Sequence, residues 1–386
     1  MNRQVGNVQL MQKMNRLKVL NYVRANPGVA RPTIATETGL SLPSLTNVTT
    51  YLLNEGLLKE IGQEDVGRVG RKGMLLKLNE LAFELLLVFI YDLHFVIVHT
   101  DLEGTVIDKT RVDMNETDPE KLVLLVRRNV MRMLSKCTQE KIRYIGVAQA
   151  KSEDSEFLLQ GGVPVKHIEI KNVLEKETGI PVYLEKISVI RSIGYFASHP
   201  ELNEDNVLFV DIDNGVRTVW IKSGEVNRFL PENIGHMTVE PDGDECYCGN
   251  RGCLEVMSSV RRMLSRYEEL SGNSARITAV HAQYTRGNAN AVAVVRECAE
   301  YIGIGIANMI NLCNPKLVVI NEGQFAKCPS VISETVNVIR RRTSKLLTDN
   351  LTVVEAVMGE DDTAVGGAKE LCNILFDIDN EDCVVQ

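Results

Sequence analysis

Four residues of the kinds that ligate metals lie close together in the sequence: His236, Cys246, Cys248 and Cys253. The cysteines follow a Cys-x-Cys-x4-Cys pattern with interspersed glycines, so one short loop can wrap its thiolates around a single ion. Three thiolates and one imidazole form a closed tetrahedral set, typical of structural zinc and without an open position for catalysis. We therefore expect one structural Zn²⁺ per chain. The alternative is three free thiols in a loop.

The other six cysteines are scattered singly and are expected to be small core residues: Cys137, Cys298, Cys313, Cys328, Cys372 and Cys383. A disulfide scaffold is not expected in a long chain whose first residues lack the apolar core of a signal peptide. No apolar run approaches the roughly 20 residues that span a bilayer. We expect a cytoplasmic protein that does not enter the membrane.

The net charge of −8 over 386 residues is unevenly distributed. Residues 1–80 contain 11 Lys/Arg and six Asp/Glu, whereas the remainder contains 32 and 45. A basic N-terminal part before an acidic remainder predicts that a polyanion binds at the front of the chain. Chance surface composition is the alternative. The length itself predicts two or three domains.

The N-terminal part has the pattern of a helix-turn-helix. Apolar residues recur at helical spacing over residues 15–26, and shorter helices are expected at 32–38 and 42–55, the last capped by Ser41. One face of the third helix is apolar, and the opposite face carries short polar residues suited to base edges in a major groove: Ser44, Thr46, Asn47 and Thr50. An ordinary solvated helix face would show the same pattern.

The segment after the third helix distinguishes these two interpretations. Strands expected at 58–61 and 74–78 make a β-hairpin, which is the wing of a winged helix. The tip combines glycines with three cations that can enter a narrow minor groove: Arg68, Arg71 and Lys72. Together these elements predict a DNA-binding domain over residues 1–80, with double-stranded operator DNA as its partner.

From residue 80 onward, strands alternate with helices, which predicts a mixed α/β body in two similar halves. Strands are expected at 85–90, 96–100, 144–148, 182–184, 207–212, 218–221 and 317–320. Helices are expected at 121–134, 173–178, 189–197 and 291–311.

The run from Gly235-His236 to Cys246-Tyr-Cys248-Gly-Asn-Arg-Gly-Cys253-Leu-Glu255 resembles the signature of the ROK family of repressors, open reading frames and sugar kinases. Residues 308–319 and 366–368 resemble two further family segments, and a winged helix is what the repressor members carry. The resemblance therefore spans nearly the whole chain.

The resemblance implies an actin-like, two-lobed ATPase body behind the winged helix-turn-helix, assembled as a homodimer or homotetramer. We expect a small lobe at 81–198, joined by a C-terminal helix at 364–386. A large lobe at 199–363 would hold the zinc loop and the oligomerisation surface. The implied function is a transcriptional regulator, a repressor.

Departures from the family's kinase motifs predict that the chain is not an enzyme. Family kinases begin with an Asp-x-Gly-Gly-Thr loop that admits phosphate, whereas residues 89–93 read Phe-Ile-Tyr-Asp-Leu without a glycine. Their Glu-Asn-Asp element, which supplies the base, reads Glu185-Lys186-Ile187 here, and isoleucine cannot accept a proton. The second phosphate loop is reduced to Asp-Asn-Gly-Val at 213–216, and the Val-Pro-Gly element reads Val-Ala-Gln-Ala at 147–150.

The family's hexose contacts correspond here to Asn233, His236 and Glu255, with Lys186 beside them. Lys186 would favour an anionic effector, such as a sugar phosphate or sugar acid, over a neutral hexose. The alternatives are that His236 serves the metal alone, that Glu255 is a solvated helix-start carboxylate, and that Lys186 pairs with a neighbouring glutamate. Two other functions stay open: an active ATP-dependent sugar kinase with an added DNA-binding domain, and a DNA-bound scaffold for a protein partner.

Overall fold

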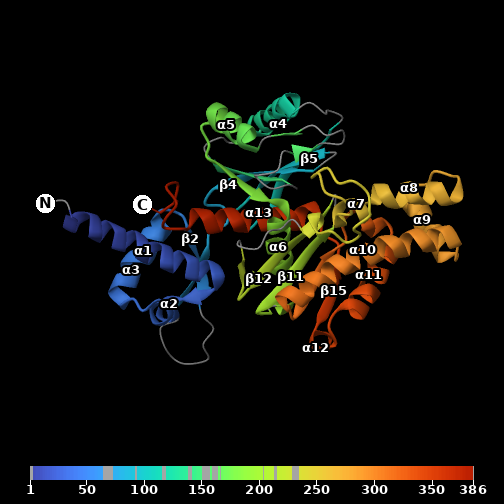
Figure 1. The fold of residues 1–386 in the computed structure, drawn as a ribbon. Coiled ribbons are helices and arrows are strands. Elements are labelled where there is room, and N and C mark those ends of the chain that lie inside the picture. Colours follow the sequence, from blue (N-terminus) through green and yellow to red (C-terminus); the bar gives the residue numbers. More distant parts are fainter. Residues whose placement is uncertain are drawn as a thin grey trace. The chain divides into compact units, whose positions relative to one another are not determined.

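The computed structural model describes the chain apart from residues 1–2, 64–72, 92–93, 115–118, 138–140, 150–156, 159–163, 166, 203, 213–214, 228–233 and 386. The chain divides into two compact units, Met1–Glu185 with Ala364–Gln386, and Lys186–Thr363. Each unit contains its own five-stranded sheet (Figure 1). The three-domain division at 1–80, 81–198 and 199–363 stays a prediction.

The first unit begins with a head that has the predicted winged-helix elements. Its helices are α1 (Arg3–Ala25), α2 (Arg31–Thr38) and α3 (Leu42–Asn54). They accompany an antiparallel sheet of order β1-β3-β2, with β1 at Val29–Ala30, β2 at Leu58–Gln63 and β3 at Met74–Leu78.

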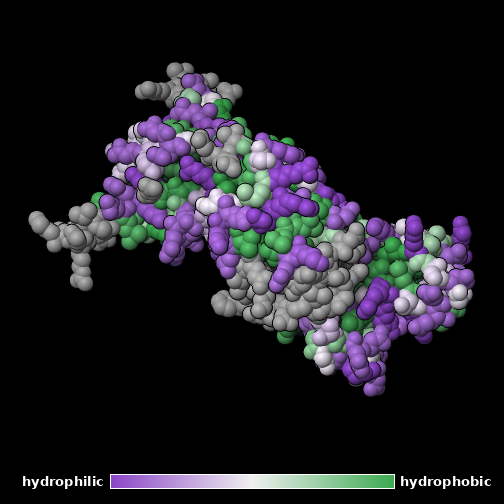
Figure 2. Space-filling view, turned by 90° about the horizontal axis from the view of Figure 1, so that it is seen from above, coloured by the Kyte–Doolittle hydropathy of each residue, from purple (hydrophilic) through white to green (hydrophobic). Residues whose placement is uncertain are grey.

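Local chemistry explains how the head's helices begin and end. Gly39 ends α2 in a left-handed conformation (φ 70°), and the Ser41 hydroxyl caps α3 by accepting a hydrogen bond from the Ser44 amide at 3.3 Å. Helix α1 starts at Arg3 instead of the expected Asn15 because no proline interrupts the segment before it. This added portion exposes four apolar side chains: Val8, Leu10, Met11 and Met14. Figure 2 shows green patches of hydrophobic surface among the hydrophilic residues of the molecule.

A five-stranded sheet of order β10-β7-β4-β5-β6 follows the head. Its strands are β4 (Glu84–Ile90), β5 (His94–Thr100), β6 (Val106–Asp113), β7 (Ile142–Gln149) and β10 (Val182–Lys186). Helices α4 (Pro119–Leu134) and α5 (His167–Thr178) pack on one face, and the short strands β8 (Phe157–Leu158) and β9 (Pro164–Val165) pair with each other. Strand β6 was not predicted, since its polar residues alternate with half-buried ones at the sheet edge.

Helix α13 (Glu360–Leu375) packs on the sheet face opposite α4 and α5 (Figure 1). Its Leu371 lies against Gly146 of β7. The helix starts four residues before the predicted residue 364, because three acidic residues in its first turn favour a helix N-terminus, and it ends at Leu375 instead of the predicted residue 386. Its far end is bonded to α1: Arg24 Nη2 donates to Asn373 Oδ1 at 2.6 Å, and Asn21 donates to the Phe376 carbonyl at 3.1 Å. The boundary between the two units falls inside this helix, after Thr363.

The second unit has a sheet of order β13-β12-β11-β14-β15. Its strands are β11 (Asn206–Ile212), β12 (Val216–Lys222), β13 (Glu225–Val226), β14 (Leu317–Asn321) and β15 (Thr352–Ala356). Helix α6 (Ile187–Ser198) packs on one face, while α10 (Ala289–Cys313) and α11 (Pro329–Arg342) cover the other.

Shorter elements complete this unit: η1 (Pro200–Leu202), η2 (Ile234–His236), α7 (Leu254–Met257), α8 (Val260–Ser271), α9 (Ile277–Thr285), η3 (Gly323–Lys327) and α12 (Lys345–Thr348). Within the part of the chain that the structure describes, no helix combines the length and apolarity needed to cross a bilayer.

Candidate functional site

The four predicted metal ligands meet in the second unit. His236 ends η2, and the cysteines lie in the following loop and at the start of α7; all four ligand atoms lie within 4.8 Å of one another. The Cys248 and Cys253 sulfurs are 3.7 Å apart, and Cys246 Sγ is 3.6 Å from His236 Nδ1. A tetrahedral zinc site has edges of about 3.8 Å between sulfurs and about 3.6 Å between sulfur and nitrogen. The donor set therefore fits one tetrahedral ion.

The thiols are also too close to ionise together without a cation. Burial, followed by hydrogen bonds with the Cys248 and Cys246 side chains, raises the pKa of Cys253 to about 12. Burial likewise raises the pKa of Cys246. A bound cation would reverse this balance, because coordination stabilises the thiolate.

Backbone geometry closes the ligand loop. The Val239 amide donates to the Gly252 carbonyl at 2.9 Å, and the Gly252 amide donates to the Asp244 carbonyl at 2.8 Å. Gly252 has φ +65°, and a Cβ atom there would lie 1.5 Å from the Glu240 carbonyl oxygen. Gly249 has φ +88° but open space around its Cα. Residue 252 must therefore be glycine both because its φ angle is positive and because the Glu240 carbonyl oxygen lies too close for a Cβ atom. Residue 249 favours glycine because of its φ angle alone.

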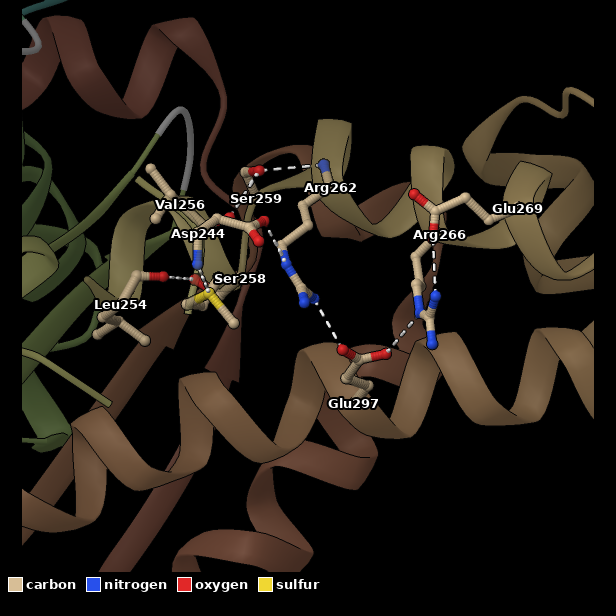
Figure 3. Close-up of polar contacts among 10 residues, drawn as sticks. Asp244, Leu254, Val256, Ser258, Ser259, Arg262, Arg266, Glu269 and Glu297 are labelled. Carbon is tan, nitrogen blue, oxygen red and sulfur yellow. Dashed lines mark hydrogen bonds and ion pairs between the residues drawn. The ribbon is translucent and has the colours of Figure 1, made fainter. Parts of the chain in front are cut away.

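An ion-pair network holds this loop against two helices (Figure 3). Arg262 of α8 donates to Asp244 through Nε and to Glu297 of α10 through Nη1, each at 2.9 Å. Arg266 pairs with the other Glu297 oxygen at 3.7 Å and with Glu269 at 2.7 Å. Arg262 is only 19% exposed, so its pairs are better shielded than ordinary surface pairs.

The predicted effector residues His236 and Glu255 are joined by a tyrosine that sequence reasoning missed. Tyr247 Oη donates to Glu255 Oε1 at 2.9 Å and lies 3.3 Å from His236 Nε2. With Nδ1 facing the cysteines, Nε2–H is free to donate to this hydroxyl, as the second nitrogen of a metal-ligating histidine usually does. Burial, and then the Glu255 charge, raise the pKa of Tyr247, while Arg217 lowers it. The phenol therefore stays protonated and links His236 to Glu255.

Two glycines leave room for the Glu255 carboxylate. A Cβ at Gly215 would lie 2.9 Å from Glu255 Cδ, and one at Gly235 would lie 2.8 Å from Glu255 Oε2. Glu255 is half-buried in the first turn of α7 and lies against these two backbone segments. Asn233 lies outside the described residues. Lys186 precedes α6 as its half-buried N-cap residue, and its effector role stays a prediction.

A second missed group lies at the end of β11. Both Asp211 oxygens accept from Arg191 Nη1 at 3.0 Å, and Asn321 donates to Oδ1 at 2.7 Å. Arg217, opposite Asp211 on β12, is 5% exposed. The sequence contains a signal for its burial, since side chains two residues apart on a strand share a face, and Arg217 shares one with the apolar Val219 and Ile221.

The predicted DNA-reading residues Ser44, Thr46, Asn47 and Thr50 are all exposed on α3. Thr46 Oγ1 donates back to the Leu42 carbonyl at 2.8 Å, and Ser44 bonds the capping Ser41. No hydrogen bond of the Asn47 side chain is found within the described residues, so its amide is available to a partner. The wing-tip cations Arg68, Arg71 and Lys72 lie outside the described residues.

Comparison with known proteins identifies the family. The model of the ROK family matches residues 93–373. The chain belongs to the ROK family. The xylose repressor of Bacillus subtilis is 21% identical over 383 residues, covering 97% of this chain and 99% of that protein. The Escherichia coli DNA-binding transcriptional dual regulator NagC is 25% identical over 385 residues, covering 92% and 91%.

Solved structures show the same fold for this ROK protein. A ROK family transcriptional regulator, a homologue of the E. coli MLC protein, superposes with a TM-score of 0.77 at 22% identity, covering 93% of this chain and 95% of that one. A ROK glucokinase from Streptomyces griseus superposes with a TM-score of 0.61 at 20% identity, covering 74% and 98%. The architecture is thus the predicted one, a winged helix-turn-helix followed by an actin-like sugar-kinase body.

The glycine geometry of the ligand loop generates a prediction. We expect Gly252→Ala to prevent loop closure and to reduce the metal content and the melting temperature, because the added methyl group meets a backbone oxygen. Gly249→Ala adds the same methyl and a comparable backbone strain of about 1–2 kcal/mol, but meets no atom. Elemental analysis and thermal unfolding of both variants make the comparison. Equal metal content and equal melting temperatures would contradict the close-approach argument.

Proposed function

We propose that this ROK protein is a DNA-binding transcriptional repressor whose body responds to a carbohydrate-derived effector in the cytoplasm. The observation that carries the proposal is the exposed, short, uncharged face of α3 in a winged-helix head joined to a sugar-kinase-like body. The names of the relatives support it, since they are repressors named for xylose and N-acetylglucosamine. The proposed effector contacts are Asn233, His236, Glu255 and Lys186.

We propose a homodimer or homotetramer as the DNA-bound form. One winged helix covers a single half-site, so two heads on a palindrome are needed for strong and specific binding. The proposed contacts are the four α3 residues in the major groove and Arg68, Arg71 and Lys72 in the minor groove.

The proposed metal is one structural zinc ion held by His236, Cys246, Cys248 and Cys253. The donor separations support it, and four protein ligands make the role structural. Zinc would stabilise the loop as a folded unit and fix the His236 ring by its Nδ1 nitrogen.

We further propose that the body has no kinase activity. Ile187, at the position of the family's catalytic base, is 1% exposed and offers no carboxylate. At the end of β4, where kinases have glycines, the rings of Tyr91 and His94 stack at 4.5 Å. Bulky rings at this turn replace the open backbone that a phosphate loop requires.

The DNA interface can be tested on α3. Asn47→Ala should relax base preference and weaken specific binding by about 1–3 kcal/mol, because a bidentate contact is lost. Asn54→Ala is the matched control, an exposed asparagine at the other end of the same helix. Fluorescence anisotropy would use duplexes that wild-type protein selects from a random-sequence pool. If both variants bound like wild type, α3 would not be the reading helix.

The metal assignment predicts about one zinc per chain in protein purified without chelators. Cys253→Ser should lose the zinc and destabilise the second unit, because metal binding at such a site is coupled to folding. Cys383→Ser, a cysteine outside the cluster, should retain both. Zinc-free wild-type protein by elemental analysis would refute the assignment.

The absence of kinase activity predicts that no sugar-dependent ADP release occurs in a coupled assay with ATP and a panel of hexoses, pentoses and N-acetylhexosamines. Ile187→Asp alone should not restore it, because the turn after β4 still lacks glycines. ATP- and sugar-dependent turnover by wild-type protein would favour the alternative of an active kinase with a DNA-binding head.

A further inference from the structure

The phenol of Tyr247 contacts two of the proposed effector residues at once. Its Oη atom lies 3.3 Å from His236 Nε2 and donates to Glu255 Oε1 at 2.9 Å. A hydroxyl group can accept one hydrogen bond while it donates another. The phenol is therefore placed to accept from the imidazole and to donate to the carboxylate, as a hydroxyl group of a bound sugar would.

The other polar atom of each of these two side chains faces the protein. His236 Nδ1 is 3.6 Å from Cys246 Sγ, within the ligand set proposed for zinc. Glu255 Oε2 lies against the backbone, because a Cβ atom at Gly235 would be 2.8 Å from it. Nε2 and Oε1 are thus the atoms best placed to meet an effector, and the same phenol contacts both.

The Tyr247 side chain can move while the backbone of the loop stays in place. Its neighbours Cys246 and Cys248 are both proposed zinc ligands, so a bound ion would hold the chain on either side of it. Tyr247 itself is 48% exposed, and exposed side chains change rotamer in picoseconds to nanoseconds. The phenol can therefore exchange with a ligand by rotation of one side chain.

We propose that Tyr247 is a gate of the effector site: its hydroxyl occupies the position of one effector hydroxyl and must be displaced before a sugar binds. This proposal rests on the proposed function of an effector-responsive repressor. Without effector, the phenol satisfies the His236 N–H and the Glu255 carboxylate. A bound sugar replaces it with a hydroxyl group of its own. The closed gate lowers the apparent affinity for a sugar, because only the open form can bind.

A supporting role of Tyr247 predicts the opposite effect of its hydroxyl. If the phenol only oriented His236 and Glu255, its loss would leave both side chains less well placed and would weaken effector binding. A direct contact between the phenol and the effector would have the same consequence. A gate predicts stronger binding when the hydroxyl is removed, because the sugar then displaces only water.

The test compares full-length wild-type protein, purified without chelators, with Tyr247→Phe and Tyr284→Phe. Tyr247→Phe removes the hydroxyl and keeps the ring. Tyr284→Phe is the matched control, since the Tyr284 hydroxyl also donates to a carboxylate, Glu334 Oε1 at 2.7 Å, but between α9 and α11.

The probes are xylose, N-acetylglucosamine, glucose, glucuronate and glucose 6-phosphate. The first two are the sugars in the names of the relatives. The readouts are the affinity for each probe by calorimetry, the zinc content by elemental analysis, and the probe concentration that releases half of the selected operator DNA.

We expect Tyr247→Phe to bind a probe recognised by the wild-type protein about 2- to 10-fold more tightly, the contribution of one or two net hydrogen bonds. Release of DNA should need correspondingly less of that probe, at an unchanged zinc content. Tyr284→Phe should match wild type in all three readouts. A probe bound by Tyr247→Phe alone would also support the gate.

Two results would overturn the gate and keep the proposed function. Equal probe affinity in wild type and Tyr247→Phe would show that the phenol does not compete with the sugar. Weaker probe binding by Tyr247→Phe would make the phenol an effector contact or, where the zinc content also falls, a support of the ligand loop. Binding of DNA without binding of any probe by either protein would instead refute the effector response, and the gate with it. Failure of wild-type protein to bind any DNA would refute the proposed repressor.

Discussion

The imidazole of His236 connects the two chemical sites of the second unit. Its Nδ1 atom faces the cysteine sulfurs, and its Nε2 atom faces the Tyr247 hydroxyl, which is bonded to Glu255. A planar ring cannot turn toward one side without turning away from the other. The orientation of this one ring therefore decides at once how its Nδ1 atom meets the cysteines and how its Nε2 atom meets the Tyr247 hydroxyl.

The end of β11 shows a different use of buried charge. Arg191, Asp211 and Asn321 come from α6, β11 and β14, and they form a network in which every Asp211 oxygen is satisfied. Such a network contributes little net stability after desolvation, but it fixes three elements in one arrangement. Arg217, opposite Asp211 on β12, is buried beside this network, and its Nη1 atom has no hydrogen-bond partner within the described residues.

The sequence predicted the local features well, because spacing along the chain determines them. The ligands of the cysteine loop, the cap at Ser41 and the exposed face of α3 all follow from residues close in sequence. Tyr247 was missed because an x position within a ligand motif carries no pattern of its own. Arg217 was missed because a cation is ordinarily read as surface. Its burial depends on pairing with β11, and the engagement of Asp211 depends on Asn321, 110 residues away. The alternation of residues along β12 indicates the face on which Arg217 lies, but it does not indicate which distant side chains engage Asp211.

Helix α13 has a mechanical consequence. Its first four residues belong to the second unit, whereas its last turn is hydrogen-bonded through Asn373 to Arg24 of the winged-helix head. A 16-residue helix is about 24 Å long and resists both stretching and twisting. In the proposed DNA-bound form, a rotation of its first turn would displace its far end by an amount that grows with the length of the helix. The spacing between two heads on DNA would be sensitive to movements far smaller than the half-site separation itself.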